Sequence, residues 1–403
     1  MIKKLRLHNF RTYLNAELTF SPRHLIVGRN NSGKTNLYAA LRFLGASATN
    51  DLAQSLLAVP GGVWEIKNWA FSSTLVELYC ECELVFENEP HLFLYELKLD
   101  VDPMILAVQT PNQQPIPRVA SEQLSVRSAK FENVALLSND GREAVMLHEE
   151  SFLRGKPQNT VKTLAPRDAT MLSKLYELET NKRAILFRRY LSSWFFFTFN
   201  PDQIRFGWRE SQSTTRGLSV SGSTLALVLY NTKNFDESQY RRIIDRTRSI
   251  EPDLEAINFI PSEGQIPIPF VELKRRRRAS WIGLSDGTLR FLALAFVSEA
   301  VRPLDGMPAP FSPLIVIEEP ENGIFPGQLR AAFDLFEDSG SSGQFVFTSH
   351  SPYFINFFDA HRESVTLLRR SNERTEIERI PQANETDPDR LLLADELSME
   401  LFP

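Results

Sequence analysis

Residues 28–35 combine residue types and a spacing that are suited to binding the phosphates of a nucleotide. They read Gly-Arg-Asn-Asn-Ser-Gly-Lys-Thr and fit the pattern G-x-x-x-x-G-K-S/T, in which backbone N–H groups close on the β-phosphate. The lysine can bridge the β- and γ-phosphates, and the hydroxyl after it can ligate Mg²⁺. Nucleotide contacts are therefore expected from Asn30, Asn31, Ser32, Gly33, Lys34, Thr35 and Asn36, with Thr35 also a metal ligand.

Two adjacent acids follow a wholly apolar run near the end of the chain. Residues 314–317 read Leu-Ile-Val-Ile, and Glu318 and Glu319 come directly after them. Ligands gather at the carboxyl ends of parallel strands. Glu318 is therefore expected to hold Mg²⁺, directly or through water, and Glu319 to orient or deprotonate an attacking water. A solvated acidic turn is the alternative, and the phosphate loop favours the catalytic interpretation.

Two weaker signals accompany the acids. His350 follows the apolar run 344–348 and could reach a γ-phosphate from there, although a single histidine is often structural. The run 284–288, Leu-Ser-Asp-Gly-Thr, precedes a helical pattern. A hydroxyl and a glycine at a helix N-terminus form an anion site. The same residues could equally form a capped turn.

The elements that must position these residues alternate between strand and helix. Strands are expected at 2–8, 15–20 and 23–27 before the phosphate loop, and a helix is expected at 36–44 after it. The last third is expected to hold helices at 287–301, 326–337 and 351–358 and strands at 313–317 and 344–348. This alternation is typical of a parallel α/β sheet.

The middle of the chain indicates a β-rich and helical insertion. Alternating apolar residues predict a hairpin from 75–86 and 92–101, followed by a proline-rich loop at 103–118 and short strands. A helical pattern at 167–191 is too short for a long coiled coil. Further patterns predict helices at 223–231 and 236–250 and strands at 194–199, 256–260 and 270–274.

The composition limits the partners of the chain. With 42% hydrophobic and 24% charged residues it has the make-up of a globular protein. Its net charge of −5 argues against binding nucleic acid through bulk charge, so any contact needs a local basic patch. The best candidate is Lys274–Arg278 (KRRRR), with Trp281 after it. A solvated hairpin end or a contact to an acidic partner would explain the same residues.

The cysteines and the apolar stretches indicate where the protein works. Cys80 and Cys82 alternate onto one strand face, and no further cysteine completes a metal site, so we expect two buried thiols. A disulfide framework and a signal peptide are both missing, which favours the cytoplasm. The most apolar stretches are too short to span a bilayer, so no membrane partner is expected.

Four motifs in one fixed order resemble a known family. They are GRNNSGKT (28–35), LSDGTLR (284–290), LIVIEEPENGIFP (314–326) and FVFTSHSPYFI (345–355). The chain resembles ABC-superfamily ATPases related to the RecF, OLD and SMC–Rad50 proteins. It is most similar to the stand-alone AAA_21 predicted ATPases often found in bacterial defence operons. The opening LRLHNFRTY (5–13) and GLSVSGSTLALVL (217–229) also resemble this group, whereas 60–200 matches only in outline.

The resemblance implies an α/β fold of the ABC-type ATPase head, a P-loop NTPase, that dimerises head to tail around two ATP molecules. The loop of one subunit would face Ser285, Asp286 and Gly287 of the other, with Ser285 and Gly287 on the γ-phosphate. Glu319 would be the catalytic carboxylate and His350 the switch histidine, beside Lys34. Asn9, Phe10 and Arg11 would lie near the base or ribose. A homodimer or a higher homo-oligomer is therefore expected.

Several residues depart from the family pattern. Glu318 stands where most ABC proteins have aspartate, and Asp286 stands where glycine is usual. Phe325 occupies a position that is often histidine in the family, so the loop after the acids does not match the family pattern there. Gln203 is the candidate for the Gln loop of the family.

The motifs divide the chain into four expected parts. Residues 1–60 and 201–370 would form the ATPase lobes, 61–200 the insertion and 371–403 a tail. Strands near 364–370 and 375–380 and a helix near 388–397 are expected at this end. The residues after the histidine are too few for a nuclease domain, so Asp387, Asp389, Asp395 and Glu396 are interpreted as surface and helix-end charges. An effector would be a separate chain.

Three functions fit these motifs. The first is an ATPase that senses a trigger in antiphage defence and controls a separate, nuclease-like effector. The second is a RecF-like DNA repair ATPase that clamps DNA. The third is a nucleotide-gated scaffold with negligible turnover. DNA-stimulated hydrolysis would favour the second, and ATP-dependent oligomerisation without turnover would favour the third.

Overall fold

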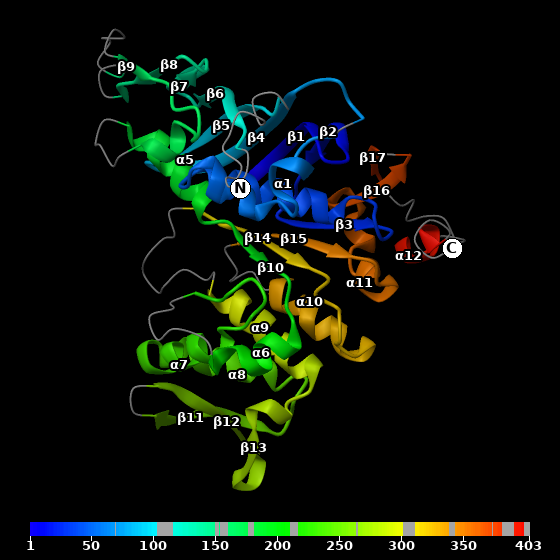
Figure 1. Cartoon of the computed structure of the whole chain (residues 1–403). Coiled ribbons are helices and arrows are strands. Elements are labelled where there is room, and N and C mark those ends of the chain that lie inside the picture. The colour runs from blue at the N-terminus through cyan, green and yellow to red at the C-terminus, as the bar shows by residue number, and fades with distance from the viewer. Residues whose placement is uncertain are drawn as a thin grey trace. The chain divides into compact units, whose positions relative to one another are not determined.

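The computed structural model divides the chain into two compact units, which are described separately. Unit 1 comprises Met1–Pro22, Gly28–Trp194 and Thr366–Ile380, and unit 2 comprises Arg23–Val27, Phe195–Val365 and Pro381–Pro403 (Figure 1). The structure describes residues 1–68, 70–102, 116–149, 153, 160–175, 181–209, 217–262, 265–300, 311–337, 343–372, 374–380 and 391–398. Most of the proline-rich segment, and Asp387 and Asp389, lie outside these residues.

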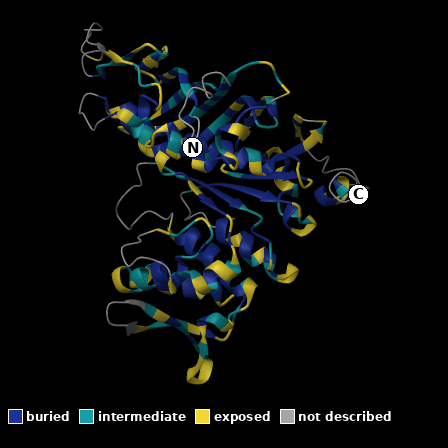
Figure 2. Ribbon diagram, in the orientation of Figure 1, coloured by how far each residue is buried: buried dark blue, intermediate teal, exposed yellow. Residues whose placement is uncertain are grey.

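Unit 2 contains a parallel sheet that confirms the predicted α/β architecture. Its strands run in the order β10, β14, β15 and β3, with bounds Phe195–Phe197, Leu314–Glu318, Gln344–Ser349 and Arg23–Gly28. Residues 314–317 and 344–349 are buried without interruption (Figure 2). A strand covered on both faces needs such a continuous apolar run, which explains the pattern seen in the sequence.

Helices connect the strands of this sheet. In chain order, α9 (Asp286–Ala300) precedes β14, and α10 (Leu329–Glu337) lies between β14 and β15. The others in unit 2 are α6 (Pro201–Phe206), α7 (Leu225–Phe235), α8 (Glu237–Thr247), α11 (Pro352–Asn356) and α12 (Leu393–Glu396). Helix α9 packs against α8, α10 and α6. Because α9 is buried along most of its length, residues at its N-terminus are held firmly.

A second sheet in unit 2 is antiparallel and has three strands. They are β11 (Leu254–Ser262), β12 (Gln265–Leu273) and β13 (Arg277–Ser280). The first two were predicted in shorter form. Strand β13 was not predicted, because its four residues are mostly cationic and carry no apolar alternation. The basic run therefore lies at the β12–β13 turn.

Unit 1 is built on an eight-stranded antiparallel sheet in the order β2, β1, β4, β5, β6, β7, β8 and β9. In chain order its strands are Ile2–Phe10, Tyr13–Thr19, Leu75–Phe86, Glu89–Asp100, Arg118–Arg127, Val134–Asn139, Glu143–Leu147 and Thr160–Leu164. The predicted hairpin is confirmed as β4 and β5. Both thiols of β4, Cys80 and Cys82, are buried and free, as expected.

Unit 1 also holds the helix after the phosphate loop and a C-terminal hairpin. Helix α1 spans Lys34–Ser47, α2 spans Leu52–Ser55 and α5 spans Lys182–Ser192. The hairpin consists of β16 (Val365–Ser371) and β17 (Arg374–Arg379), which confirms both strands expected there. Strand β17 lies beside β2. A segment from the end of the chain is thus placed next to the beginning.

The helix predicted at 167–191 is wrong in its first part. A short 3₁₀ turn occupies Leu172–Lys174, and α5 begins only at Lys182. Before the turn, the backbone pairs with distant residues instead of with itself: Ala169 bridges Asp51, and Leu52 N donates to Asp168 O. Tertiary pairing has therefore overridden the local helical pattern.

No helix in the described part of the chain is long and apolar enough to cross a membrane. Those residues also show no long coiled coil, since the longest helix, α9, has 15 residues.

Candidate functional site

The phosphate loop joins the end of β3 to the start of α1, as predicted. Gly33 takes a φ of 113°, a left-handed conformation that glycine adopts without strain. A Cβ on Gly28 would lie 2.4 Å from Ser32 Oγ and 2.6 Å from Leu368 O, so the backbone is packed too closely for a side chain there. Both glycines of the motif are therefore required by the fold of the loop itself.

The N-terminus of α1 has the features of an anion-binding site. No side chain caps this helix and its first turn carries no acid, so the N–H groups and the positive end of the dipole remain available. Ser32 Oγ is buried and has no hydrogen-bond partner among the residues that the structure describes, whereas Thr35 is exposed. Lys34 Nζ donates to Gly28 O at 2.5 Å and to Arg29 O at 3.0 Å, and so reaches across the loop. These features fit a polyphosphate.

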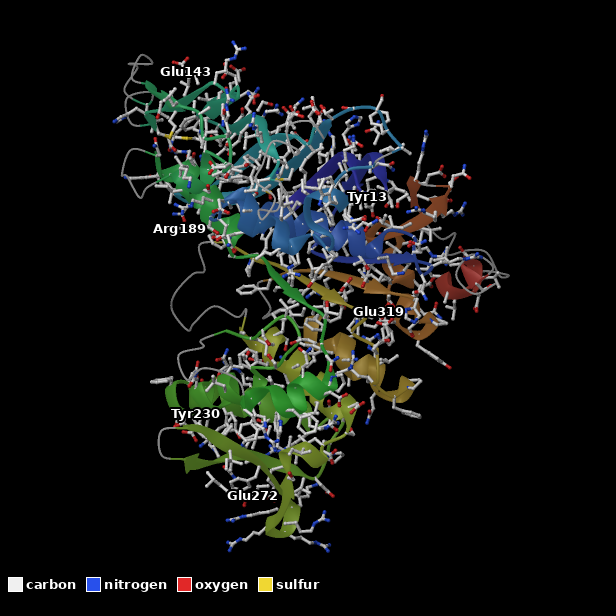
Figure 3. The ribbon with its side chains drawn as sticks, viewed as in Figure 1. Tyr13, Glu143, Arg189, Tyr230, Glu272 and Glu319 are labelled. Carbon is white, nitrogen blue, oxygen red and sulfur yellow. The ribbon has the colours of Figure 1, made fainter. Side chains whose placement is uncertain are left out.

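Two residues from other strands donate hydrogen bonds to backbone carbonyl groups of the loop. Tyr13, which is labelled in Figure 3, donates from its Oη to Gly33 O at 3.0 Å. Thr375 Oγ1 donates to Ser32 O at 2.9 Å. Thr375 also contacts Thr12, whose Oγ1 lies 2.6 Å from Thr375 Oγ1. Nothing in the local pattern indicates these contacts, because Thr375 comes 343 residues after Ser32.

We predict that Thr375→Val will weaken nucleotide binding about tenfold, because it leaves the buried Ser32 carbonyl unpaired and loosens the loop. Valine keeps the shape of threonine, so the thermal midpoint should fall little. Titration with a fluorescent ATP analogue measures the effect. Thr375→Ser retains the hydroxyl and is expected to bind like the unchanged chain. Equal affinity of the valine and serine variants would contradict the supporting role.

Arg11, which the resemblance placed near the nucleotide, contacts the first turn of α1. Its Nε donates to Asn36 Oδ1 at 2.7 Å and its Nη1 to Pro60 O at 2.7 Å. Asn36 in turn donates to Thr12 Oγ1 at 2.8 Å. Arg11 has a φ of 51°, which is uncommon for a residue other than glycine. Asn36 and Arg11 therefore form one network at the mouth of the loop.

The acidic pair stands at the carboxyl end of β14. Glu318 pairs with Thr348 in the neighbouring strand, and its Oε2 accepts a hydrogen bond from Thr198 Oγ1 at 2.7 Å. Glu319 follows with a φ of 46°, in the left-handed region. Such a conformation is held by surrounding contacts and is frequent in functional sites. Here Glu319 N donates to Thr348 O at 3.0 Å.

Glu319 and His350 meet in the structure of unit 2. Although 31 residues separate them, His350 Nδ1 lies 3.2 Å from Glu319 Oε1. The other carboxylate oxygen accepts from Asn322 Nδ2 at 2.6 Å. Ser349, the residue before the histidine, pairs with Val27, which directly precedes Gly28. The predicted carboxylate and histidine are thus brought together at the carboxyl ends of β14 and β15, and β15 pairs with β3, the strand that precedes the phosphate loop in the chain.

A third acid, Glu321, supports the histidine and was missed by the sequence analysis. It is only 7% exposed. Its Oε1 accepts from Ser349 Oγ at 2.5 Å and from His350 N at 3.3 Å. Burial raises the pKa of Glu321 above its ordinary value. In the sequence Glu321 is visible only as the second acid of Glu-Pro-Glu. Its burial, which the sequence does not reveal, distinguishes it from an ordinary surface acid.

The run 284–288 forms the capped start of α9. Thr288 N donates to Ser285 Oγ at 3.1 Å, while Ser285 itself is exposed. A Cβ on Gly287 would lie 2.8 Å from Gly323 O, which explains the glycine by its contact with the loop after the acids. Asp286, which is expected to contact the nucleotide, pairs with Arg205 at 2.5 Å.

Arg205 ties the segment before α9 to helix α6. Besides Asp286, it donates to Ile282 O at 3.0 Å and to Leu284 O at 3.1 Å. Gln203, the candidate for the Gln loop, lies on the same helix with an exposed side chain. Hydrogen bonds and an ion pair from Arg205 therefore link the proposed Gln-loop helix to the Ser-Asp-Gly segment. No local pattern in the sequence indicates this link.

The predicted metal ligands are one hydroxyl, Thr35, and one carboxylate, Glu318. Within the described ranges, no three His, Cys, Asp or Glu side chains gather into a metal cluster. A hydroxyl and a carboxylate are ligands of the kind that Mg²⁺ takes, because Mg²⁺ typically binds one or two protein oxygens together with phosphates and water.

The parallel sheet and the helices that connect its strands give the chain an α/β fold similar to that of an SMC head. More narrowly, the chain belongs to the AAA_21 family, described as "AAA domain, putative AbiEii toxin, Type IV TA system", whose match covers residues 23–356. That range contains all four motifs. None of the curated protein sequences matches the chain.

Solved structures of SMC heads are similar to the chain. The fold is similar to a crystal structure of the SmcHead bound to the C-winged helix domain of ScpA, with a TM-score of 0.51 and 14% identity over 94% of this chain and 97% of that chain. An SMC head domain from Thermotoga maritima gives a TM-score of 0.45 and 12% identity over 94% and 99% of the two chains. At this identity the first likeness establishes the fold alone.

Proposed function

We propose that the chain binds and hydrolyses ATP with Mg²⁺. The contact between Glu319 and His350 carries this proposal, since two polar residues from separate motifs meet at the carboxyl ends of adjacent parallel strands. The uncapped start of α1 and the buried hydroxyl of Ser32 support it from the side of the phosphate loop. A buried hydroxyl without a hydrogen-bond partner is costly unless a ligand uses it.

The residues divide the work of hydrolysis among them. Glu319 orients a water and accepts its proton as the oxygen attacks the γ-phosphorus and the bond to ADP breaks. His350 contacts the same carboxylate and would sense the γ-phosphate. Lys34 and the N–H groups of the loop stabilise the negative charge on the phosphates. Bound through Thr35 and Glu318, Mg²⁺ would supply further charge neutralisation.

We also propose that ATP joins two copies of the chain head to tail. Ser285 lies exposed at the N-terminus of the 15-residue helix α9, which provides a second anion-binding helix end besides that of α1. Ser285 and Gly287 of one copy would contact the ATP that is held by the phosphate loop of the other copy. The N-terminus of α9 from one copy and that of α1 from the other would then bind the same nucleotide. The nucleotide would then act as part of the interface.

The dimer is proposed to act as the sensor and regulator of a separate, nuclease-like effector in antiphage defence, in the cytoplasm. The description of the family by a toxin and its TA system supports a role in a system with more than one component. A change between ATP-joined and separated subunits would give such a system its switch.

Mass photometry with parallel phosphate-release assays tests the proposal. ATP with Mg²⁺ is expected to shift the protein from monomer to dimer or a higher even oligomer, ADP should not, and phosphate should be released. Failure to bind ATP would overturn the proposal. Dimers without phosphate release would favour the nucleotide-gated scaffold, and hydrolysis that depends on DNA would favour the DNA-clamping alternative.

A further inference from the structure

The turn between β12 and β13 concentrates positive charge in a protein of net charge −5. Lys274–Arg278 contributes five consecutive cations, and all five are exposed at the tip of this hairpin (Figure 2). In Figure 1 the tip of the hairpin points away from helices α7 and α8. Such a placement presents charge to a partner and contributes little to the core.

The backbone of the tip is unfavourable for the residues that occupy it. Arg275 and Arg276 have φ values of 62° and 59°, both in the left-handed region. At a tight hairpin turn this conformation is ordinarily taken by Asn-Gly, for which it is far less strained. Two arginines at this place are therefore explained by what their side chains do rather than by the turn.

The ion pairs at the tip leave its outermost cations unneutralised. Asp253 lies 3.7 Å from Lys274 and 3.5 Å from Arg277. Glu272, opposite Arg278 in the strand register and labelled in Figure 3, accepts a hydrogen bond from Asn258 at 2.7 Å. Arg275 and Arg276 form no ion pair with any residue that the structure describes. Two guanidinium groups thus stay available.

The hairpin is fixed rigidly at its base. Trp281, just after β13, is 1% exposed, and its Nε1 donates to Ile204 O at 3.3 Å. Trp281 therefore cannot stack on a base, which corrects the expectation that it completes a nucleic-acid site together with the basic run. Lys274 N also donates to Asp253 O at 2.8 Å. A fixed base lowers the entropy cost of binding at the tip.

We propose that this tip binds the phosphate backbone of a nucleic acid. Guanidinium groups match phosphate oxygens in geometry and charge, and backbone binding needs only such contacts. An acidic protein surface is the less suitable partner, because protein interfaces rely on a buried apolar or aromatic centre. The five tip residues offer none.

A double substitution can remove charge from the tip while keeping the backbone conformation of the turn. Arg275→Asn with Arg276→Gly installs the turn residues that this backbone favours, so the thermal midpoint should stay equal or rise. We expect binding of a 20-base-pair DNA duplex to weaken about tenfold or more at low salt. The slope of log affinity against log salt should fall by about 2, one for each lost phosphate contact. Fluorescence anisotropy without ATP measures both quantities, so the result stands apart from hydrolysis.

Matched controls decide the outcome. Arg241→Gln with Arg330→Gln removes two arginines whose side chains are 71% and 62% exposed, and should leave the affinity and the slope nearly unchanged. Equal losses in both double variants, or no loss at the tip, would overturn the proposal. Tighter binding of polyglutamate than of nucleic acid would overturn it in favour of an acidic protein. Parallel titrations with single-stranded DNA and duplex RNA identify the preferred nucleic acid.

Discussion

Glu319→Gln is expected to bind ATP as tightly as the unchanged chain and to hydrolyse it at least about a hundredfold more slowly. Glutamine keeps the size of the side chain but cannot accept a proton from the attacking water, and general-base catalysis is typically worth about 10²- to 10⁴-fold. The remaining carbonyl oxygen can still accept from Asn322, whose Nδ2 now lies 2.6 Å from Glu319 Oε2. The loop after β14 should therefore keep its shape.

The same substitution should change the assembly as well as the rate. If hydrolysis releases the two copies, a chain that binds ATP without cleaving it should accumulate as an ATP-joined dimer. Single-turnover phosphate release and mass photometry on one sample test both effects. Glu237→Gln, on the exposed surface of α8, is the control and should behave normally. Normal turnover by the Glu319 variant would assign the catalytic role to another residue.

The parts of the candidate site that could be predicted are those whose residue types are dictated by their own loop or strand. The phosphate loop needs Gly28 for close packing and Gly33 for its left-handed backbone, and both requirements fix residue types at set spacings. The position of Glu318 and Glu319 at the end of β14 could be predicted because a buried parallel strand leaves an uninterrupted apolar run before its carboxyl end. The position of His350 after β15 follows from the same argument one strand further on.

The missed parts depend on contacts between distant segments. Thr375 is a polar residue in an alternating strand, and only the docking of β17 beside β2 places its hydroxyl on the loop. Arg205 is likewise an ordinary helical arginine until α6 packs against α9. Trp281 shows the opposite error. Its nearness to the basic run suggested a shared surface, but its side chain turns inward and bonds to Ile204.

A pair of inactive variants tests whether each ATP site draws on two copies of the chain. Lys34→Ala should abolish binding, because it removes the charge that reaches across the loop. Ser285→Asp should abolish ATP-dependent turnover by placing a negative charge against the γ-phosphate. Aspartate caps helices as well as serine does, so α9, whose Thr288 N now donates to Ser285 Oγ at 3.1 Å, should remain intact. Ser285→Asn keeps the cap without the charge and is the control for the fold.

Mixing the two variants is then expected to restore activity that neither has alone. In a head-to-tail dimer of one copy of each, one site combines both lesions and the other combines an intact loop with an intact Ser285. Random pairing makes half of the dimers mixed, so about a quarter of the normal number of sites should be regained. Phosphate release against mixing ratio should peak at equal amounts. A mixture that stays inactive at every ratio would place Ser285 in the same site as the loop of its own chain, and the nucleotide would then no longer be the link between two copies.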